Sequence, residues 1–137
     1  MERLVVAAIV VAVIAVVAVI LERRRPGPPT QGQWPVPTQL DRADFDRPDA
    51  PWLVAVFSSA TCDSCADAVA KSRALASDAV VVEEVEAKAR ADIHRRYLIQ
   101  AVPTIVVADA EGVVRASFVG PPSATDLWAA VAEARQE

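Results

Sequence analysis

The stretch Thr61-Cys62-Asp63-Ser64-Cys65 decides how the rest of the chain is interpreted, because it contains both cysteines of a 137-residue protein. It follows a continuous apolar run, residues 52–57, which is typical of a strand buried on both faces. The residues from 63 to 76 then have the spacing of a helix, so the cysteines are predicted to lie at a helix N-terminus. There the partial positive charge of the helix stabilises a thiolate and lowers the pKa of the first thiol.

Two thiols in a Cys-x-x-Cys spacing can close a small disulfide and exchange it with another molecule. In this interpretation Cys62 is the nucleophile that forms a mixed disulfide with a protein substrate, and Cys65, one turn later, resolves it. Asp63 and Ser64 are expected to tune the pair. The carboxylate of Asp63 competes for the helix dipole and should raise the pKa of the Cys62 thiol, which favours a weaker oxidant. The redox-active disulfide is the only cofactor expected.

Other interpretations of the cysteine pair have different consequences. A purely structural disulfide would close a four-residue loop and constrain the unfolded chain very little. A tetrahedral zinc site needs about four ligands, and His94 is the only other soft ligand, so no metal site is predicted within one chain. Two alternatives stay open: a two-thiolate metallochaperone that shares copper between chains, and a redox-inactive module that binds a protein partner.

The N-terminus is dominated by 18 consecutive Leu, Val, Ala and Ile residues from Leu4 to Leu21. As a helix this run would reach about 27 Å, close to the roughly 30 Å of a hydrocarbon core, so a single transmembrane helix is predicted. The charged residues 22–25 follow it at once, where a cleaved signal peptide would have small uncharged residues. The predicted location is therefore the cell membrane, with a single span, and the arginines that follow favour a cytoplasmic C-terminal domain.

Three regions are predicted along the chain. Residues 1–25 form the anchor with its basic flank, residues 26–37 a proline-rich linker, and residues 38–137 the folded domain. A short first strand is predicted at 36–40, across the boundary between the linker and the domain. Residues 36–137 contain 10 basic and 16 acidic side chains, a charge of −6, which argues against nucleic acid as a partner.

Apolar runs and turn residues predict the order of elements in the domain. Strands are expected at 36–40, 52–57, 79–85, 104–108 and 113–118, and helices at 63–76, 89–98 and from 123 onward. The last two strands flank a hairpin turn that ends in Gly112. This order predicts an α/β domain in which helices pack on a mixed sheet.

The chain has a second motif, Val102-Pro103-Thr104, with its proline 38 positions after Cys65. A buried strand, Cys-x-x-Cys, a helix and this tripeptide together resemble the thioredoxin family, from about residue 36 to the C-terminus. The resemblance implies a thioredoxin-like fold in which Pro103 is a cis proline facing the cysteines. It also implies that the Val102 backbone pairs with an extended protein substrate, and that Thr61 contacts the same substrate.

The chain also departs from the family pattern. Thr61, Asp63 and Ser64 stand where the usual motif has Trp, Gly and Pro, and Val56 stands where the family has a buried aspartate that helps to deprotonate the resolving thiol. We therefore expect slow turnover. The resulting hypothesis is a membrane-anchored thiol-disulfide oxidoreductase that acts on protein dithiols or disulfides. The sequence predicts neither its oligomeric state nor the direction of electron flow.

Three minor expectations concern the surroundings of these motifs. Ala66, Val69 and Ala70 are expected to form the buried face of the helix that follows the cysteines. The acidic residues between 83 and 86 indicate a solvated strand end, and His94 is expected on a solvated helix face among arginines.

Overall fold

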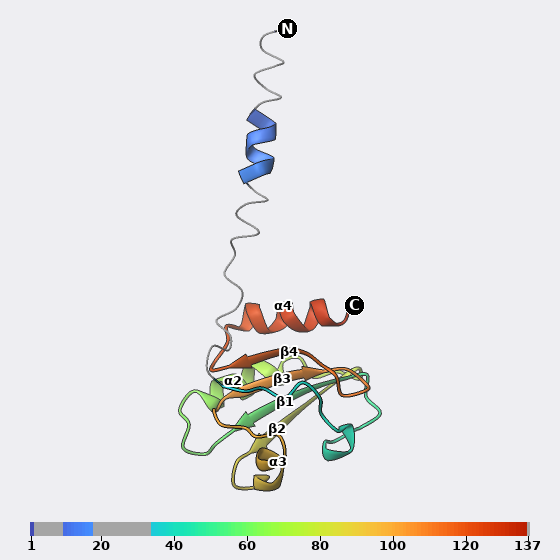
Figure 1. Cartoon of the computed structure of the whole chain (residues 1–137), viewed down its shortest axis with the longest axis vertical. Coiled ribbons are helices and arrows are strands. Elements are labelled where there is room, and N and C mark those ends of the chain that lie inside the picture. Colours follow the sequence, from blue (N-terminus) through green and yellow to red (C-terminus); the bar gives the residue numbers. More distant parts are fainter. Residues whose placement is uncertain (2–9, 18–33, 137) are drawn as a thin grey trace.

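The structure, a computed structural model of the chain, describes residues 1, 10–17 and 34–136. Within residues 34–136, a short 3-10 helix comes first, and from residue 52 onward strands and helices follow one another in the predicted order. Their bounds are η1 (Arg42–Asp44), β1 (Trp52–Ser58), α2 (Cys65–Arg73), β2 (Val80–Glu86), α3 (Ala91–Arg96), β3 (Thr104–Ala108), β4 (Val114–Val119) and α4 (Ala124–Ala134). The predicted α/β architecture, with helices on a mixed sheet, is confirmed (Figure 1).

The strands form one sheet in the order β2-β1-β3-β4. β1 is parallel to β2 and antiparallel to β3, and β3 is antiparallel to β4. The predicted first strand at 36–40 does not form, because that segment contributes only an isolated bridge from Gln39 to Val113. In the described sheet, β2 is therefore the outer strand on one side, and the N-terminal segment approaches the other side at β4.

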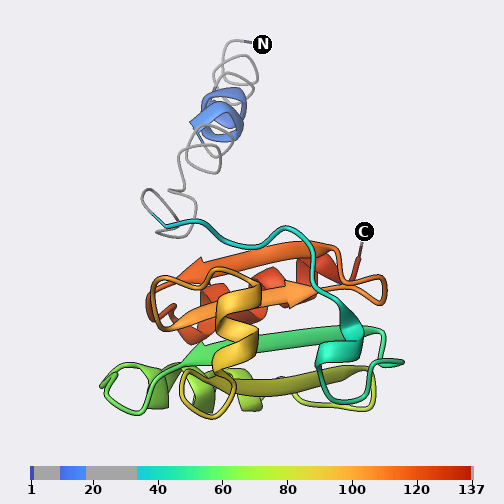
Figure 2. The same ribbon diagram turned by 60° about the horizontal axis from the view of Figure 1, so that its bottom comes forward.

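Side chains alternate along β1 and divide the core into two layers. Leu53, Ala55 and Phe57 belong to the cluster on one face, and Val54 and Val56 belong to the cluster on the other. Figure 2 shows α3 and η1 in front of the sheet, with α2 and α4 behind it. The front face is thus covered by two short elements and the irregular segments beside them, while longer helices cover the back face.

The structure contradicts the prediction of a transmembrane helix. Among the described residues, no helix is long and apolar enough to cross a membrane. The described helical residues, 10–17, span about 12 Å, which is less than half of a hydrocarbon core of roughly 30 Å. The rest of the predicted span at 4–21, and residues 18–33 with most of the predicted linker, lie outside the described residues. This finding contradicts both the predicted helix and the single-pass membrane location that depended on it.

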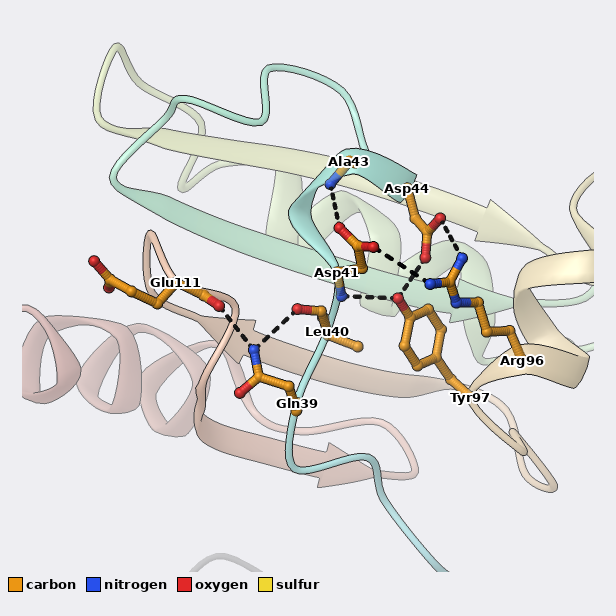
Figure 3. Close-up of polar contacts among 8 residues, drawn as sticks. All are labelled: Gln39, Leu40, Asp41, Ala43, Asp44, Arg96, Tyr97 and Glu111. Atoms are coloured by element: carbon orange, nitrogen blue, oxygen red, sulfur yellow. Dashed lines mark hydrogen bonds and ion pairs between the residues drawn. The ribbon is translucent and has the colours of Figure 1, made fainter.

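A polar cluster joins η1 to α3 on the front face of the sheet (Figure 3). The Tyr97 hydroxyl donates a hydrogen bond of 2.5 Å to Asp44 Oδ2 and accepts one of 2.9 Å from the backbone N–H of Asp41. The Arg96 guanidinium bridges the carboxylates of Asp41 and Asp44, at 3.3 and 3.0 Å. The Tyr97 ring also stacks on Phe45, with ring centroids 6.1 Å apart. This cluster therefore anchors the short 3-10 helix to the segment that leads towards Pro103.

The cluster predicts a pH-dependent stability. Burial, and then the hydrogen bond to Asp44, raise the pKa of Tyr97 to about 12, whereas an unfolded tyrosine has a pKa near 10. The folded state favours the neutral phenol more strongly than the unfolded state does. The resulting contribution of Tyr97 to the free energy of unfolding is complete below about pH 10 and is lost as the pH rises through about 12. The chain contains one tyrosine, so tyrosinate absorbance reports Tyr97 alone.

We expect a tyrosinate titration midpoint near 12 in the folded chain and near 10 in concentrated urea. The variant Asp44→Asn removes the charge and the strongest acceptor but keeps the burial, so its midpoint should fall between the two. A midpoint near 10 in the folded wild-type chain would contradict the described hydrogen bond.

Candidate functional site

Cys62 lies in the connection that follows β1, and Cys65 is the first residue of α2. Cys62 and Cys65 form a disulfide with an Sγ–Sγ distance of 2.17 Å and Cα atoms 5.4 Å apart. Two successive turns shape this connection. The N–H of Cys62 donates to the carbonyl of Ser59 at 3.1 Å, and the N–H of Cys65 donates to the carbonyl of Cys62 at 3.2 Å. The pair can therefore form the small disulfide that its spacing predicts.

The two sulfur-bearing residues differ in accessibility. Cys62 is half-buried, whereas Cys65, the first residue of α2, is buried at 3% exposure. A second molecule can thus approach Cys62 more readily than Cys65. This asymmetry is what an attacking thiol and a resolving thiol require, because the resolving thiol has to reach only its partner in the same chain.

The residues inside and before the motif face solvent or the disulfide. Ser64 is the N-cap of α2, but its side chain makes no capping hydrogen bond, and its Oγ lies 3.7 Å from Cys62 Sγ. Asp63 is exposed. Thr61 is also exposed, and its Oγ1 lies 3.2 Å from the Oγ of Ser59. Ser64 is therefore the motif residue placed to hydrogen-bond the first sulfur, and Thr61 is accessible to a partner.

The Val102-Pro103 segment precedes β3 and lies at the same end of the inner strands as the cysteine loop. The peptide bond between Val102 and Pro103 is cis, as the resemblance implies. The next residue, Thr104, pairs with Phe57 near the end of β1, so the segment lies beside the start of the cysteine loop. The Pro103 carbonyl accepts from Gly120 N–H at 2.8 Å, whereas the backbone of Val102 forms no hydrogen bond to any described residue. The backbone N–H and C=O of Val102 are thus not used within the described part of the chain.

Val56 lies in the core beneath α2. It is fully buried and packs in the same cluster as Ala68 and Val69 of α2 and Ile105 of β3. Cys65 begins the same helix, and the side chain at position 56 offers it no carboxylate that could act as a general base.

The sequence indicated that the glutamates of β2 form a solvated strand end. Glu84 is exposed as expected, and Glu84 and Glu86 also form hydrogen bonds to the end of β1 and to the start of the cysteine loop. Glu84 accepts a 2.8 Å hydrogen bond from the buried Ser58 Oγ at the end of β1 and pairs with Arg73 of α2 at 3.2 Å. Glu83 pairs with Arg90 at 2.8 Å. These contacts depend on the parallel register, which places Glu84 beside Val56 and Glu86 beside Ser58. The sequence pattern alone does not show this register, so the contacts could not be predicted from it.

Glu86 connects the cysteine loop to the loop after β2. Its carboxylate accepts backbone hydrogen bonds from Ala89 at 2.8 Å, from Lys88 at 2.9 Å and from Ala60 at 3.3 Å. These N–H groups, that of Ala89 most strongly, hold the pKa of the Glu86 carboxyl below its usual value. The ionised Glu86 therefore fixes Ala60, two residues before Cys62.

His94 was expected on a solvated face, and this expectation is wrong. Its ring is half-buried and meets the Phe57 ring edge-on, with centroids 5.3 Å apart and an interplanar angle of 82°. Its Nε2 lies 2.8 Å from the carbonyl oxygen of Val85, so Nε2 carries a hydrogen and donates it. His94 thus packs α3 onto the edge of the sheet that carries the cysteines.

Comparison with solved structures supports the fold of this domain. No protein-family model matches the chain, and no curated protein sequence matches it. The germline-specific thioredoxin Deadhead from Drosophila melanogaster superposes with a TM-score of 0.57 at 22% identity, over 66% of this chain and 88% of that chain. Fasciola hepatica thioredoxin gives 0.55 at 22% identity, over 64% and 85%.

Mitochondrial thioredoxin 3 from Saccharomyces cerevisiae, in its oxidised form, gives a TM-score of 0.53 at 21% identity, over 61% of this chain and 79% of that chain. These similarities establish the fold. The chain has a thioredoxin-like fold with a cysteine pair that can form a disulfide.

Proposed function

We propose that this protein is a thiol-disulfide oxidoreductase that exchanges two electrons with protein dithiols or disulfides through Cys62 and Cys65. The observation that carries the proposal is the disulfide between an accessible and a buried cysteine, located at the sheet edge where Pro103 and the unpaired Val102 backbone also lie. Its thioredoxin-like fold supports the same function.

In the reducing direction, the Cys62 thiolate attacks one sulfur of a substrate disulfide. A mixed disulfide forms, and the other substrate sulfur leaves as a thiolate that takes up a proton. Cys65 then loses its proton, and its thiolate attacks Cys62 Sγ. The Cys62–Cys65 disulfide forms, the second substrate thiolate leaves, and the substrate has gained two electrons. The reverse sequence oxidises a substrate dithiol.

The neighbouring residues have defined roles in this proposal. Ser64 Oγ, 3.7 Å from Cys62 Sγ, donates a hydrogen bond to the thiolate. The exposed carboxylate of Asp63 opposes that stabilisation and favours a weaker oxidant. An extended substrate pairs with the Val102 backbone next to Pro103 and passes Thr61.

Cysteine substitutions test the proposal directly. The full-length Cys65→Ser variant should retain a protein substrate as a mixed disulfide on Cys62, and that adduct should dissolve in dithiothreitol. Cys62→Ser is the matched control and should retain none. Both variants should lose at least 99% of the wild-type activity towards a peptide whose fluorescence rises when its disulfide is reduced, because each removes one of the two sulfurs the cycle needs.

A redox titration of the wild-type chain completes the test. Alkylation of free thiols across glutathione buffers should show one two-electron transition, and its midpoint gives the favoured direction of electron flow. If no disulfide forms at any accessible potential, the oxidoreductase function is lost. A partner bound equally by the wild type and by a variant without cysteines would indicate the redox-inactive binding module instead.

A further inference from the structure

The segment between α3 and Pro103 displays an exposed leucine in an unfavourable backbone conformation. Leu98 is 68% exposed and has a φ of +53°. Its N–H donates to the carbonyl of Arg95 at 3.2 Å, and the next residue, Ile99, donates to the carbonyl of His94 at 2.9 Å, which together close the end of α3. A left-handed residue at such a helix end is usually glycine, because another residue costs about 1–2 kcal/mol there. The stability of the fold therefore does not explain why a leucine occupies this position.

Leu98 forms the wall of a shallow groove. The groove has a volume of about 480 Å³ and is lined by His94, Arg95, Leu98, Ile99 and Gln100. Ile99 is half-buried and packs against the core, so it fixes the floor, while Leu98 stands free. The groove ends two residues before Val102, the backbone that is open to a substrate strand.

Arg95 gives the groove a positive charge. The neighbouring arginines are neutralised, Arg90 by Glu83 and Arg96 by two aspartates of the η1 segment. Arg95 is exposed and forms no ion pair with any described residue. Residues 36–137 carry a charge of −6, so this free cation is a local exception on an acidic domain. A carboxylate is therefore attracted to this groove and repelled by the exposed Asp63 on the cysteine side.

We propose that the groove selects protein substrates in which an apolar side chain is next to an aspartate or glutamate. The apolar side chain covers Leu98 and Ile99, and the carboxylate pairs with Arg95. The same extended segment then continues past Val102 and brings its sulfur to Cys62. This inference rests on the proposed function, because it names the class of substrate that the redox site receives.

The test uses the full-length protein and three disulfide peptides that differ at one position: Leu-Asp, Leu-Asn or Leu-Lys beside the reactive cysteine. The wild type should show a kcat/KM about fivefold higher for Leu-Asp than for Leu-Asn, the upper range for an exposed ion pair, and the ratio should fall towards one in 1 M salt. Arg95→Glu should reverse this order and prefer Leu-Lys. Arg135→Glu, the same charge change at the exposed end of α4, should keep the wild-type order.

A second variant tests the apolar contact. Leu98→Gly keeps the left-handed turn at no steric cost, so it should fold at least as stably as the wild type. We compare the ratio of kcat/KM for the Leu-Asp peptide to kcat/KM for a small aromatic disulfide that does not fill the groove. This ratio should be about tenfold lower in Leu98→Gly than in the wild type. If Leu98→Gly destabilises the domain and leaves this ratio unchanged, Leu98 is structural and the inference fails.

The outcomes separate this inference from the proposed function. Reduction of all three peptides at equal rates by the wild type and by Arg95→Glu would overturn the inference and leave the oxidoreductase function standing. If the wild type reduces neither the peptides nor the small disulfide, both fail. A dimer by sedimentation that Leu98→Gly converts to a monomer would show that a second copy of the chain occupies the groove, and would also overturn the inference.

Discussion

Replacing Val56 by aspartate is expected to lower the free energy of unfolding by roughly 3 kcal/mol or more, and to speed the resolution of the mixed disulfide about tenfold at neutral pH. Val56 is fully buried between the sheet and α2, so a carboxyl group there loses its hydration. The same burial raises the pKa of the new carboxyl towards neutrality, where a general base works best. Cys65, at the start of α2, is the thiol that must lose a proton.

The measurement is the decay of a preformed mixed disulfide on Cys62, followed by quenching at intervals between pH 6 and 9. Val54→Asp is a matched control, because Val54 is equally buried on the same face of β1 but lies two residues farther from the cysteine loop. It should lose similar stability without accelerating resolution. An unchanged rate in folded Val56→Asp would show that position 56 does not limit turnover, and equal acceleration by both variants would point to general loosening of the core.

Replacing Gly112 by alanine is expected to destabilise the domain by about 3 kcal/mol, through backbone strain and loss of core packing. Gly112 has a φ of +80°, and a Cβ at this position would lie 1.9 Å from the carbonyl oxygen of Leu40. Leu40 cannot simply move away. Its N–H donates to the Gly112 carbonyl at 2.8 Å, and its side chain is 1% exposed in the core of the front face.

Gly120→Ala is the control for this prediction. Gly120 has a similar φ of +91°, but an added Cβ would meet no atom within 4 Å. It should therefore cost only the conformational term of about 1–2 kcal/mol. Urea unfolding followed by circular dichroism gives both values. Equal losses in the two variants would show that the contact between Leu40 and the hairpin contributes nothing beyond the backbone conformation of the glycine.

Local sequence patterns were sufficient for the elements whose structure depends on local chemistry. β3 occupies the predicted residues 104–108, and the hairpin turns at Gly112 with positive φ, because an apolar β-branched run and a turn glycine restrict the backbone directly. α2 was located, but its buried face was wrong in part. Ala66 and Ala70 are exposed, because an alanine-rich helix has a weak apolar stripe and packing decides which side is covered.

In the candidate site, too, some residues could be identified from the sequence, whereas others depend on tertiary packing. Its cysteines were singled out by their spacing and Pro103 by the resemblance to the thioredoxin family. The contact of Glu84 with Ser58 depends on the pairing of β1 with β2, which no local pattern encodes. The membrane prediction failed as well. Among the described residues no helix is long and apolar enough to cross a membrane, so the apolar run from residue 4 to 21 was not sufficient evidence for one.

The strand order also affects how copies of this protein meet one another. With the N-terminal segment beside β4, the outer side of β2 in the described sheet is an open edge of the kind that can recruit a strand from another molecule. Pairing with a second β2 would bring Glu83, Glu84 and Glu86 of both chains together, and like charges on adjacent strands repel. These carboxylates, two of which contact the end of β1 or the cysteine loop, therefore disfavour pairing between the β2 edges of two molecules.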